Sequence, residues 1–191
     1  CDSRQIFKEM TIGTAVPDAS QLQAVKHYFI QDHSVTEDYT AGKYELEANA
    51  LVQELFAEGD RTLVMCGGSG FYIDAFCKGL DDFPPADQAL RAELTARWKA
   101  EGVAPLAEEL RRLDPETCEE IDLSNGQRVV RALEVCLMTG RKFSSFKTAP
   151  LRKRDFVIEK IGIERPREEL YRRIDSRVLK MIEAGLVEEV R

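Results

Sequence analysis

The sequence predicts an α/β protein in which a parallel-sheet core is interrupted by a small all-helical domain. The apolar run that begins at Leu63 is typical of a buried strand, and it ends at Gly67 and Gly68. A helix-compatible run follows at 71–78, so this stretch is a strand, a tight glycine turn and a helix start. A second strand-like run at 156–163 returns to the sheet, as expected of a doubly wound domain.

The stretch between these two runs contains helical patterns alone, after a proline-containing edge at 81–87. The expected helices are 87–101, 104–113, a segment that starts at Asp114 and Pro115, and 127–138. We therefore place the α/β core in 1–83 and 146–191, and the helical insertion in 84–145.

The core contains three further expected elements. A helix is predicted at 39–56, where apolar residues recur at helical spacing, and a short strand at 27–30. The last helix begins near Pro166 and breaks near Gly185. Its apolar stripe consists of Leu170, Ile174, Val178, Met181 and Ile182.

The composition is that of an ordinary globular protein, with 43% hydrophobic and 32% charged residues among 191. The net charge of −7 argues against a protein that coats nucleic acid with its whole surface, but it permits a local basic surface. No apolar run reaches the length of a membrane span. The five cysteines lack a C-x-x-C pair, which indicates reduced thiols in a cytoplasmic protein, and no pattern indicates a zinc site.

The glycine turn at 67–70 is the first candidate binding feature. Glycine lets the backbone approach a ligand closely, and the N–H groups of a helix N-terminus can bind a phosphate or a polar substrate. The alternative is a turn that needs glycine for packing alone. Asp2 and Ser3 are good capping residues, and the simplest interpretation of Asp2 is a cap on the turn at 4–6.

A second candidate lies in the last helix of the insertion, where Gln127, Arg128 and Arg131 share one face. Two arginines and a glutamine there can hold phosphates and read the edge of a base. The alternative is a solvated face on which Arg131 pairs with Glu134, three residues further along.

Two further basic features follow. Six cations lie between 141 and 154 with no acidic residue among them, interleaved with Phe143 and Phe146. This run indicates either a local anionic partner or a solvated loop. Arg177 lies beside the apolar stripe of the last helix, where it either covers apolar surface with its stem or reaches a ligand.

Six segments, in one order along nearly the whole chain, resemble the tRNA dimethylallyltransferases (tRNA isopentenyltransferases). Residues 2–8 resemble D-S-x-Q-[VI]-[YF], 12–17 resemble I-G-T-A-K-P with Val16 for lysine, and 27–30 resemble H-H-[LF]-I with Tyr28 for the second histidine. Residues 67–72 resemble G-G-[TS]-G-[LF]-Y, 125–134 resemble N-D-x-[QR]-R-x-x-R-A-L-E with Gly126 for aspartate, and 139–140 resemble the T-G that follows.

The resemblance implies a P-loop NTPase-like core whose helical insertion grips the anticodon stem-loop of tRNA. The implied reaction moves a dimethylallyl group from its diphosphate to N6 of the adenosine on the 3′ side of the anticodon, in tRNAs that read codons beginning with U. Dimethylallyl diphosphate and tRNA are the implied partners, Mg²⁺ is the implied cofactor, and the protein is expected to be a monomer with no membrane association.

The same resemblance assigns roles to individual residues. Asp2 matches the family's general base, and Arg177 matches the arginine that faces the diphosphate. The implied tRNA contacts are Asp2, Ser3, Arg4, Gln5, Ser69, Arg91, Gln127, Arg128, Val129, Val130 and Arg131.

The family's G-x-x-x-x-G-K-[ST] loop lies upstream of the segment at 2–8, so no diphosphate-binding loop can be assigned in these residues. We accordingly expect the 191 residues alone to be inactive. Three other functions remain open: an adenylate isopentenyltransferase that uses a free nucleotide, a small-molecule kinase and a non-catalytic RNA-binding module.

Overall fold

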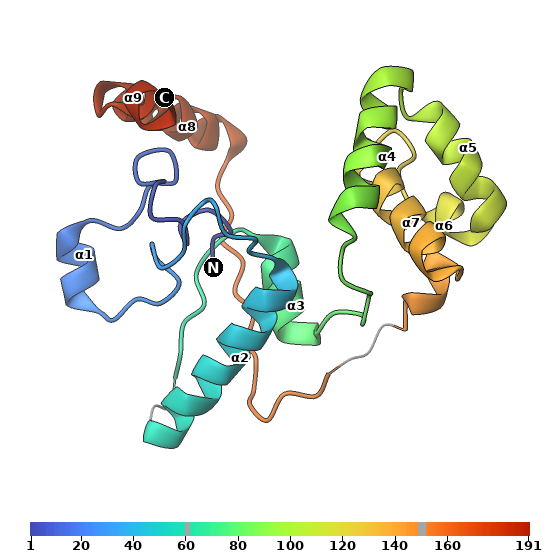
Figure 1. Cartoon of the computed structure of the whole chain (residues 1–191). Helices are drawn as coiled ribbons and strands as arrows, with labels where there is room; N and C mark the ends of the chain where they lie inside the picture. Colours follow the sequence, from blue (N-terminus) through green and yellow to red (C-terminus); the bar gives the residue numbers. More distant parts are fainter. Residues whose placement is uncertain (60–61, 149–151) are drawn as a thin grey trace. The chain divides into compact units, whose positions relative to one another are not determined.

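The computed structural model describes residues 1–59, 62–148 and 152–191. Its contacts divide the chain into two compact units (Figure 1). The first unit consists of Cys1–Gly79 and Arg152–Arg191, and the second is Leu80–Leu151. The limits expected for the insertion, 84 and 145, both fall inside the second unit.

The described part of the first unit contains five helices. They are α1 (Ala19–Ala24), α2 (Ala41–Glu58), α3 (Gly70–Lys78), α8 (Arg167–Glu183) and α9 (Leu186–Val190). The helices expected at 39–56, at 71–78 and after Pro166 are thus present, and Gly185 separates α8 from α9. No helix was predicted at α1, although Asp18 and Gln21 form a capping box that marks its start.

Helices α2 and α3 pack against each other and form the apolar centre of the first unit. Tyr44, Ala48 and Phe76 are buried there, and the ring of Phe156 stacks on that of Phe76 at a centroid distance of 5.8 Å. A buried ion pair adjoins this cluster, because Glu45 accepts a hydrogen bond of 2.9 Å from Arg154. One member of the basic run therefore contributes to the interior of this unit rather than to a solvated loop.

The parallel sheet expected from the sequence is not confirmed. In the described residues the backbone forms a single isolated parallel bridge, between Phe7 and His33. The segments 62–69 and 156–163 carry no strand assignment, and Val64 and Val157 are 87% and 88% exposed. Strand propensity reflects packing on a pleated surface, so an apolar run without a neighbouring strand forms no ladder.

The short strand predicted at 27–30 is wrong. This segment is irregular, and Phe29 and Gln31 have the positive φ angles +59° and +52°, which a strand does not accommodate. The chain turns here so that the N–H of Gln31 donates to the carbonyl of Gln5 and that of His33 donates to Ile6. The apolar pattern alone did not indicate these two left-handed residues.

The second unit is helical, as its sequence predicts. It contains α4 (Gln88–Glu101), α5 (Ala104–Leu113), α6 (Pro115–Glu120), α7 (Gly126–Thr139) and a 3₁₀ turn, η1 (Phe143–Phe146). Helix α7 packs against both α4 and α5 (Figure 1). The fully buried residues of this core are Leu94, Leu106, Leu110, Val129, Ala132 and Leu133.

Buried Asp114 connects three elements of this unit. Its carboxylate accepts the N–H and hydroxyl of Thr117, which caps α6, and the N–H and hydroxyl of Ser144 in η1. Burial raises its pKa, but these hydrogen bonds outweigh the burial and leave the pKa of Asp114 below its ordinary value. The carboxylate therefore stays ionised at neutral pH and holds η1 on the helices.

Gly126, the first residue of α7, lies so close to Trp98 that a Cβ at this position would overlap the indole ring. Replacing Gly126 with aspartate, as in the family motif, adds a favourable charge at the helix N-terminus worth about 0.3–1 kcal/mol. The ring of Trp98 is half-buried against the helical core, and overpacking of a core costs about 1–3 kcal/mol. We therefore expect Gly126→Asp to destabilise the second unit, as measured by chemical unfolding.

Trp98 is the only tryptophan of the chain, so its fluorescence reports the unfolding of this unit selectively. Combining Gly126→Asp with Trp98→Leu should remove the clash and restore part of the lost stability. Because the double variant has no tryptophan, its unfolding is followed by circular dichroism. A Gly126→Asp protein as stable as the wild type would show that the ring moves aside without cost.

Candidate active site

The N-terminal turn and the glycine turn, 66 residues apart in sequence, lie against each other in the first unit. The N–H of Ser3 donates to the hydroxyl of Ser69 over 2.9 Å, and that hydroxyl donates to Ser3 Oγ over 3.2 Å. Gly67 has a φ of +150°, and a Cβ there would overlap the backbone of Cys1. Glycine is therefore required for this close approach, which brings two of the predicted site segments together.

Asp2 caps the turn that follows it, as the simplest interpretation of the sequence predicted. Its Oδ1 accepts the N–H groups of Arg4 and Gln5 over 2.8 and 3.3 Å, and the residue is half-buried. Within the described residues no hydrogen bond involves Oδ2. One carboxylate oxygen thus fixes the turn, and the other remains able to accept a proton.

Gln5 connects this turn to the loop at 11–15. Its Nε2 donates to the carbonyls of Thr14 and Ala15, both over 3.0 Å. The side-chain amide nitrogen is therefore used within the protein, whereas Arg4, its neighbour, is exposed. Among the site residues predicted in this turn, Gln5 has a clear structural task that the sequence did not reveal.

The glycine turn offers fewer free donors than expected for a phosphate site. The N–H of Gly70 donates to the carbonyl of Gly68, and that of Tyr72 donates to the carbonyl of Ser69. The Ser69 hydroxyl does not cap α3 and instead contacts Ser3. The geometry thus favours a packing and positioning role for this turn.

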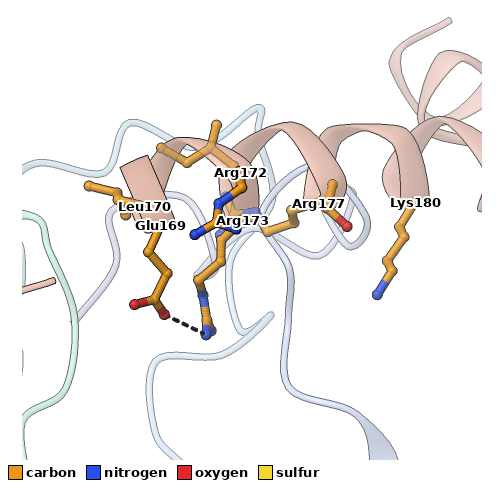
Figure 2. A pocket seen from close by; sticks show the side chains of 8 residues that line it. Glu169, Leu170, Arg172, Arg173, Arg177 and Lys180 are labelled. Carbon is orange, nitrogen blue, oxygen red and sulfur yellow. Dashed lines mark ion pairs between the residues drawn. The ribbon is translucent and has the colours of Figure 1, made fainter. Parts of the chain in front are cut away.

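Helix α8 presents a mixed cationic and apolar surface around Arg177. An open hollow of about 630 Å³ runs along the helix, lined by Glu169, Leu170, Arg172, Arg173, Ile174, Ser176, Arg177 and Lys180. Figure 2 shows Arg173 and Lys180 leaving the same side of α8, with Glu169 near Arg173 at 3.9 Å. Neither Arg177 nor Lys180 forms an ion pair with any residue that the structure describes.

The apolar stripe of α8 is largely exposed. Met181 is buried, but Leu170 and Ile174 are 41% and 47% exposed and belong to the hollow. Arg177 therefore lies beside partly exposed apolar side chains rather than beside a buried stripe, and both interpretations of its side chain stay open. Cations beside exposed aliphatic side chains suit a ligand with an anionic end and a hydrocarbon end. Arg173 lies one turn before Arg177, a spacing from which the sequence could have identified it.

In the second unit, buried Glu134 organises two of the predicted RNA contacts. Its carboxylate accepts Arg91 over 2.8 and 3.1 Å, Arg131 over 3.1 Å and the N–H of Asp87 over 2.9 Å. Arg131 also donates to the carbonyl of Pro84 over 2.8 Å. The predicted Arg131–Glu134 pair is thus present, and both arginines are structural in this unit.

The remaining predicted contacts on α7 divide by exposure. Gln127 and Arg128 are exposed, so their side chains are available to a partner. Val129 and Val130 are 0% and 5% exposed and pack in the helical core. A helix face alternates in this way because successive residues are about 100° apart, so the whole run 127–131 cannot face one ligand.

The basic run beside η1 is largely engaged within the second unit. Lys142 pairs with Glu116 at 2.9 Å, and Lys147 pairs with Glu120. The guanidinium of Arg141 lies over the ring of Phe146 at 4.4 Å. These contacts account for the interleaved phenylalanines without an anionic partner.

The described residues contain no group of three or more His, Cys, Asp or Glu side chains that could hold a metal ion. Among the same residues, no helix has the length and hydrophobicity needed to cross a membrane.

Comparison with known proteins gives consistent relatives. The profile of the IPP transferase family matches residues 5–191, so Asp2, Ser3 and Arg4 lie just outside the matched range. The chain is 47% identical over 190 residues to tRNA dimethylallyltransferase 2 of Azobacteroides pseudotrichonymphae and 49% identical to that of Porphyromonas gingivalis. These alignments cover 100% of this chain and 62% and 63% of the relatives.

Solved structures show the same likeness. The full-length tRNA isopentenylpyrophosphate transferase of Bacillus halodurans aligns with a TM-score of 0.59 and 31% identity, over 98% of this chain and 58% of that one. A eukaryotic dimethylallyltransferase, 21% identical, shares the fold with a TM-score of 0.66, over 98% of this chain and 46% of that one. The match over nearly all residues shows that this chain belongs to the IPP transferase family.

Proposed function

We propose that this chain is the catalytic and tRNA-binding portion of a tRNA dimethylallyltransferase. The observation that carries the proposal is the packing of the Asp2 turn on the glycine turn, which assembles two family motifs into one site. The names of the relatives support the reaction class, and the chain spans 62% of the length of the first of them.

The acceptor in this proposal is N6 of the adenosine on the 3′ side of the anticodon. The amine attacks C1 of dimethylallyl diphosphate, the N–C bond forms, and the C–O bond breaks with its electron pair leaving on diphosphate. The exocyclic amine is a weak nucleophile because its lone pair is delocalised into the purine. Asp2 takes the N6 proton through Oδ2, while Oδ1 stays bonded to Arg4 and Gln5 and holds the carboxylate in place.

Arg177 contributes positive charge to the leaving diphosphate, with Arg173 and Lys180 on the same surface of α8. Fixed cations stabilise charge that develops in the transition state more than charge already present in the ground state. Leu170 and Ile174 supply apolar contact for the five-carbon chain. The glycine turn, through Ser69, positions Ser3 rather than binding phosphate directly.

Mg²⁺ remains part of the proposal only as an ion brought with the diphosphate. The described residues do not offer a carboxylate cluster that would hold it. Mg²⁺ usually keeps several waters and binds substrate phosphates with one or two carboxylates. No step of the mechanism above depends on its position.

The parallel sheet also remains a proposal. The segments 62–69 and 156–163 have no regular secondary structure in the described residues and expose β-branched side chains such as Val64, Val157 and Ile161. Such runs are typical of strands that are buried on both faces of a parallel sheet. We propose that they pair with further strands in the complete core.

The test of the proposed function is a product assay on the full-length gene product. The protein is incubated with dimethylallyl diphosphate, Mg²⁺ and unmodified tRNA, and mass spectrometry detects the dimethylallyl adduct on adenosine. We expect the adduct on tRNA and none on AMP. An adduct on AMP alone indicates an adenylate isopentenyltransferase, and tRNA binding without product indicates an RNA-binding module.

Binding of the anticodon stem-loop is proposed to depend on Gln127 and Arg128, the exposed pair on α7. Replacing Arg128 with alanine removes one phosphate contact, so we expect weaker tRNA binding. The slope of log K against log salt should also fall by about 1. Filter binding at several salt concentrations measures both effects.

Arg112 on α5 provides the matched control, because its side chain is also exposed, at 77%, in the same unit. Arg112→Ala should leave the affinity and the salt slope unchanged. Equal losses in both variants would mean that general positive charge, rather than this face of α7, determines binding.

A further inference from the structure

The carboxylate of Glu189, in α9, is held by three consecutive backbone N–H groups of the loop at 11–15. Its Oε2 accepts Thr11 over 3.0 Å and Ile12 over 2.6 Å, and its Oε1 accepts Gly13 over 2.9 Å. These hydrogen bonds, that from Gly13 first, lower the pKa of Glu189, so the side chain is ionised at neutral pH. Three donors on one carboxylate are more than a surface acid ordinarily receives.

The loop and α9 are also in close steric contact. A Cβ on Gly13 would lie 3.1 Å from Leu186 Cδ1 and 3.4 Å from Glu189 Oε1, so glycine permits the approach. The loop is strained at Ala15, whose φ is +52°. A residue other than glycine keeps a positive φ only where the surrounding contacts enforce it. This loop has such contacts on two sides.

The second side of the loop faces the candidate active site. The carbonyls of Thr14 and Ala15 accept the side chain of Gln5, and the N–H of Gln5 donates to Asp2 Oδ1. On its other side the loop is bound to α9, which is connected to α8 by a short turn at Gly185. In Figure 1 the N-terminal loop, in dark blue, lies beside the red helices α8 and α9. Glu189 thus lies between the Asp2 turn and the helix that carries Arg177.

We propose that Glu189 is a positioning residue, which holds the loop at 11–15 on α9 and so fixes Asp2 and Gln5 in register with the arginines of α8. This inference rests on the proposed function for the roles of Asp2 and Arg177. Glu189 contacts neither reactant and acts through backbone amides. No motif indicated it, because its three partners lie more than 170 residues earlier in the chain.

The kinetic test compares Glu189→Ala with Glu188→Ala in the full-length gene product. A displacement of about 1 Å in a catalytic group costs up to about 100-fold in rate. We expect Glu189→Ala to lower kcat by about 10- to 100-fold with the KM for tRNA nearly unchanged, because the helical unit is untouched. The side chain of Glu188 is exposed and makes no hydrogen bond to another described residue, and its backbone N–H, which donates to the carbonyl of Gly185, is unaffected by alanine, so this variant should match the wild type.

A double-mutant cycle with Gln5→Ala separates positioning from general stability. If Glu189 acts through the loop and Gln5, the two losses in kcat should overlap, and the double variant should be little slower than the slower single variant. Arg128→Ala is expected to weaken tRNA binding, so in combination with Glu189→Ala the two losses in kcat/KM should multiply. A kcat for folded Glu189→Ala within twofold of the wild type, or full multiplication with Gln5→Ala, would overturn the proposal.

Amide hydrogen exchange provides a readout that does not depend on activity. Loss of the carboxylate should raise the exchange of the Thr11, Ile12 and Gly13 amides, and unchanged protection would contradict the inference. If the alanine variant does not fold, Glu189→Gln, which retains one acceptor oxygen, should show a smaller change in the same direction. A wild type that makes no product fails the proposed function, whereas the exchange result still decides whether Glu189 holds the loop.

Discussion

Replacing Asp2 with alanine is expected to lower kcat by about 10²- to 10⁴-fold in the full-length gene product, the range for loss of a general base. In the structure Oδ1 of Asp2 caps the turn, and the proposed function adds a second task, in which Oδ2 takes the N6 proton. Loss of a cap costs about 1 kcal/mol of stability and does not by itself slow the chemistry of folded protein.

Asp2→Asn distinguishes these two tasks. Asparagine keeps an oxygen that can accept the N–H groups of Arg4 and Gln5, but it cannot take a proton at neutral pH. If Asp2 is the general base, both variants should lose about 10²- to 10⁴-fold in kcat, and the asparagine variant should be as stable as the wild type. Single-turnover measurements with tRNA held near saturation isolate this step. An asparagine variant with wild-type kcat would leave Asp2 as a turn cap alone.

The helices could be predicted from the sequence because their signals are local. Periodic apolar residues mark α2, α4, α5 and α7 within a few residues of their observed ends. Asp and Asn caps begin α4 and α7, and terminal glycines follow α2, α4 and α7. Strands carry no such local guarantee. The run at 62–66 has the composition of a buried strand, but a ladder also needs a partner strand, which the run itself does not specify.

The candidate site was predictable where its residues belong to motifs and unpredictable where long-range contacts decide. Ser3 and Ser69 contact each other, so two of the motif segments lie together. The carboxylate of Glu189 is bound by backbone N–H groups of the loop at 11–15. Every residue except proline carries such a group, so no side chain in the sequence indicates the contact. Spacing alone could not show whether Arg131 faces solvent or Glu134, because both arrangements satisfy the same helical period.

The second large effect is expected on stability, from Glu134→Ala in the helical unit. Glu134 is fully buried and accepts hydrogen bonds from Arg91, Arg131 and the backbone of Asp87. Removing one member of a buried charged cluster typically costs about 3–5 kcal/mol. The arginine side chains are 39% and 29% exposed and can be partly hydrated, so we expect about 3 kcal/mol.

A loss of about 3 kcal/mol corresponds to a fall of roughly 12–24 °C in the Tm of a unit of this size. Trp98 fluorescence follows the unfolding of this unit alone, and Glu93→Ala, an exposed acid on α4, is the control with no expected change. Glu134→Gln keeps the volume and one acceptor oxygen, so its loss should be smaller. An alanine variant that melts within about 3 °C of the wild type would show that hydration of Arg91 and Arg131 compensates for the hydrogen bonds lost with Glu134. If the large loss is found, weaker tRNA binding by Arg131→Ala cannot be attributed to a direct contact, because the same substitution removes part of the cluster that fixes α4 on α7.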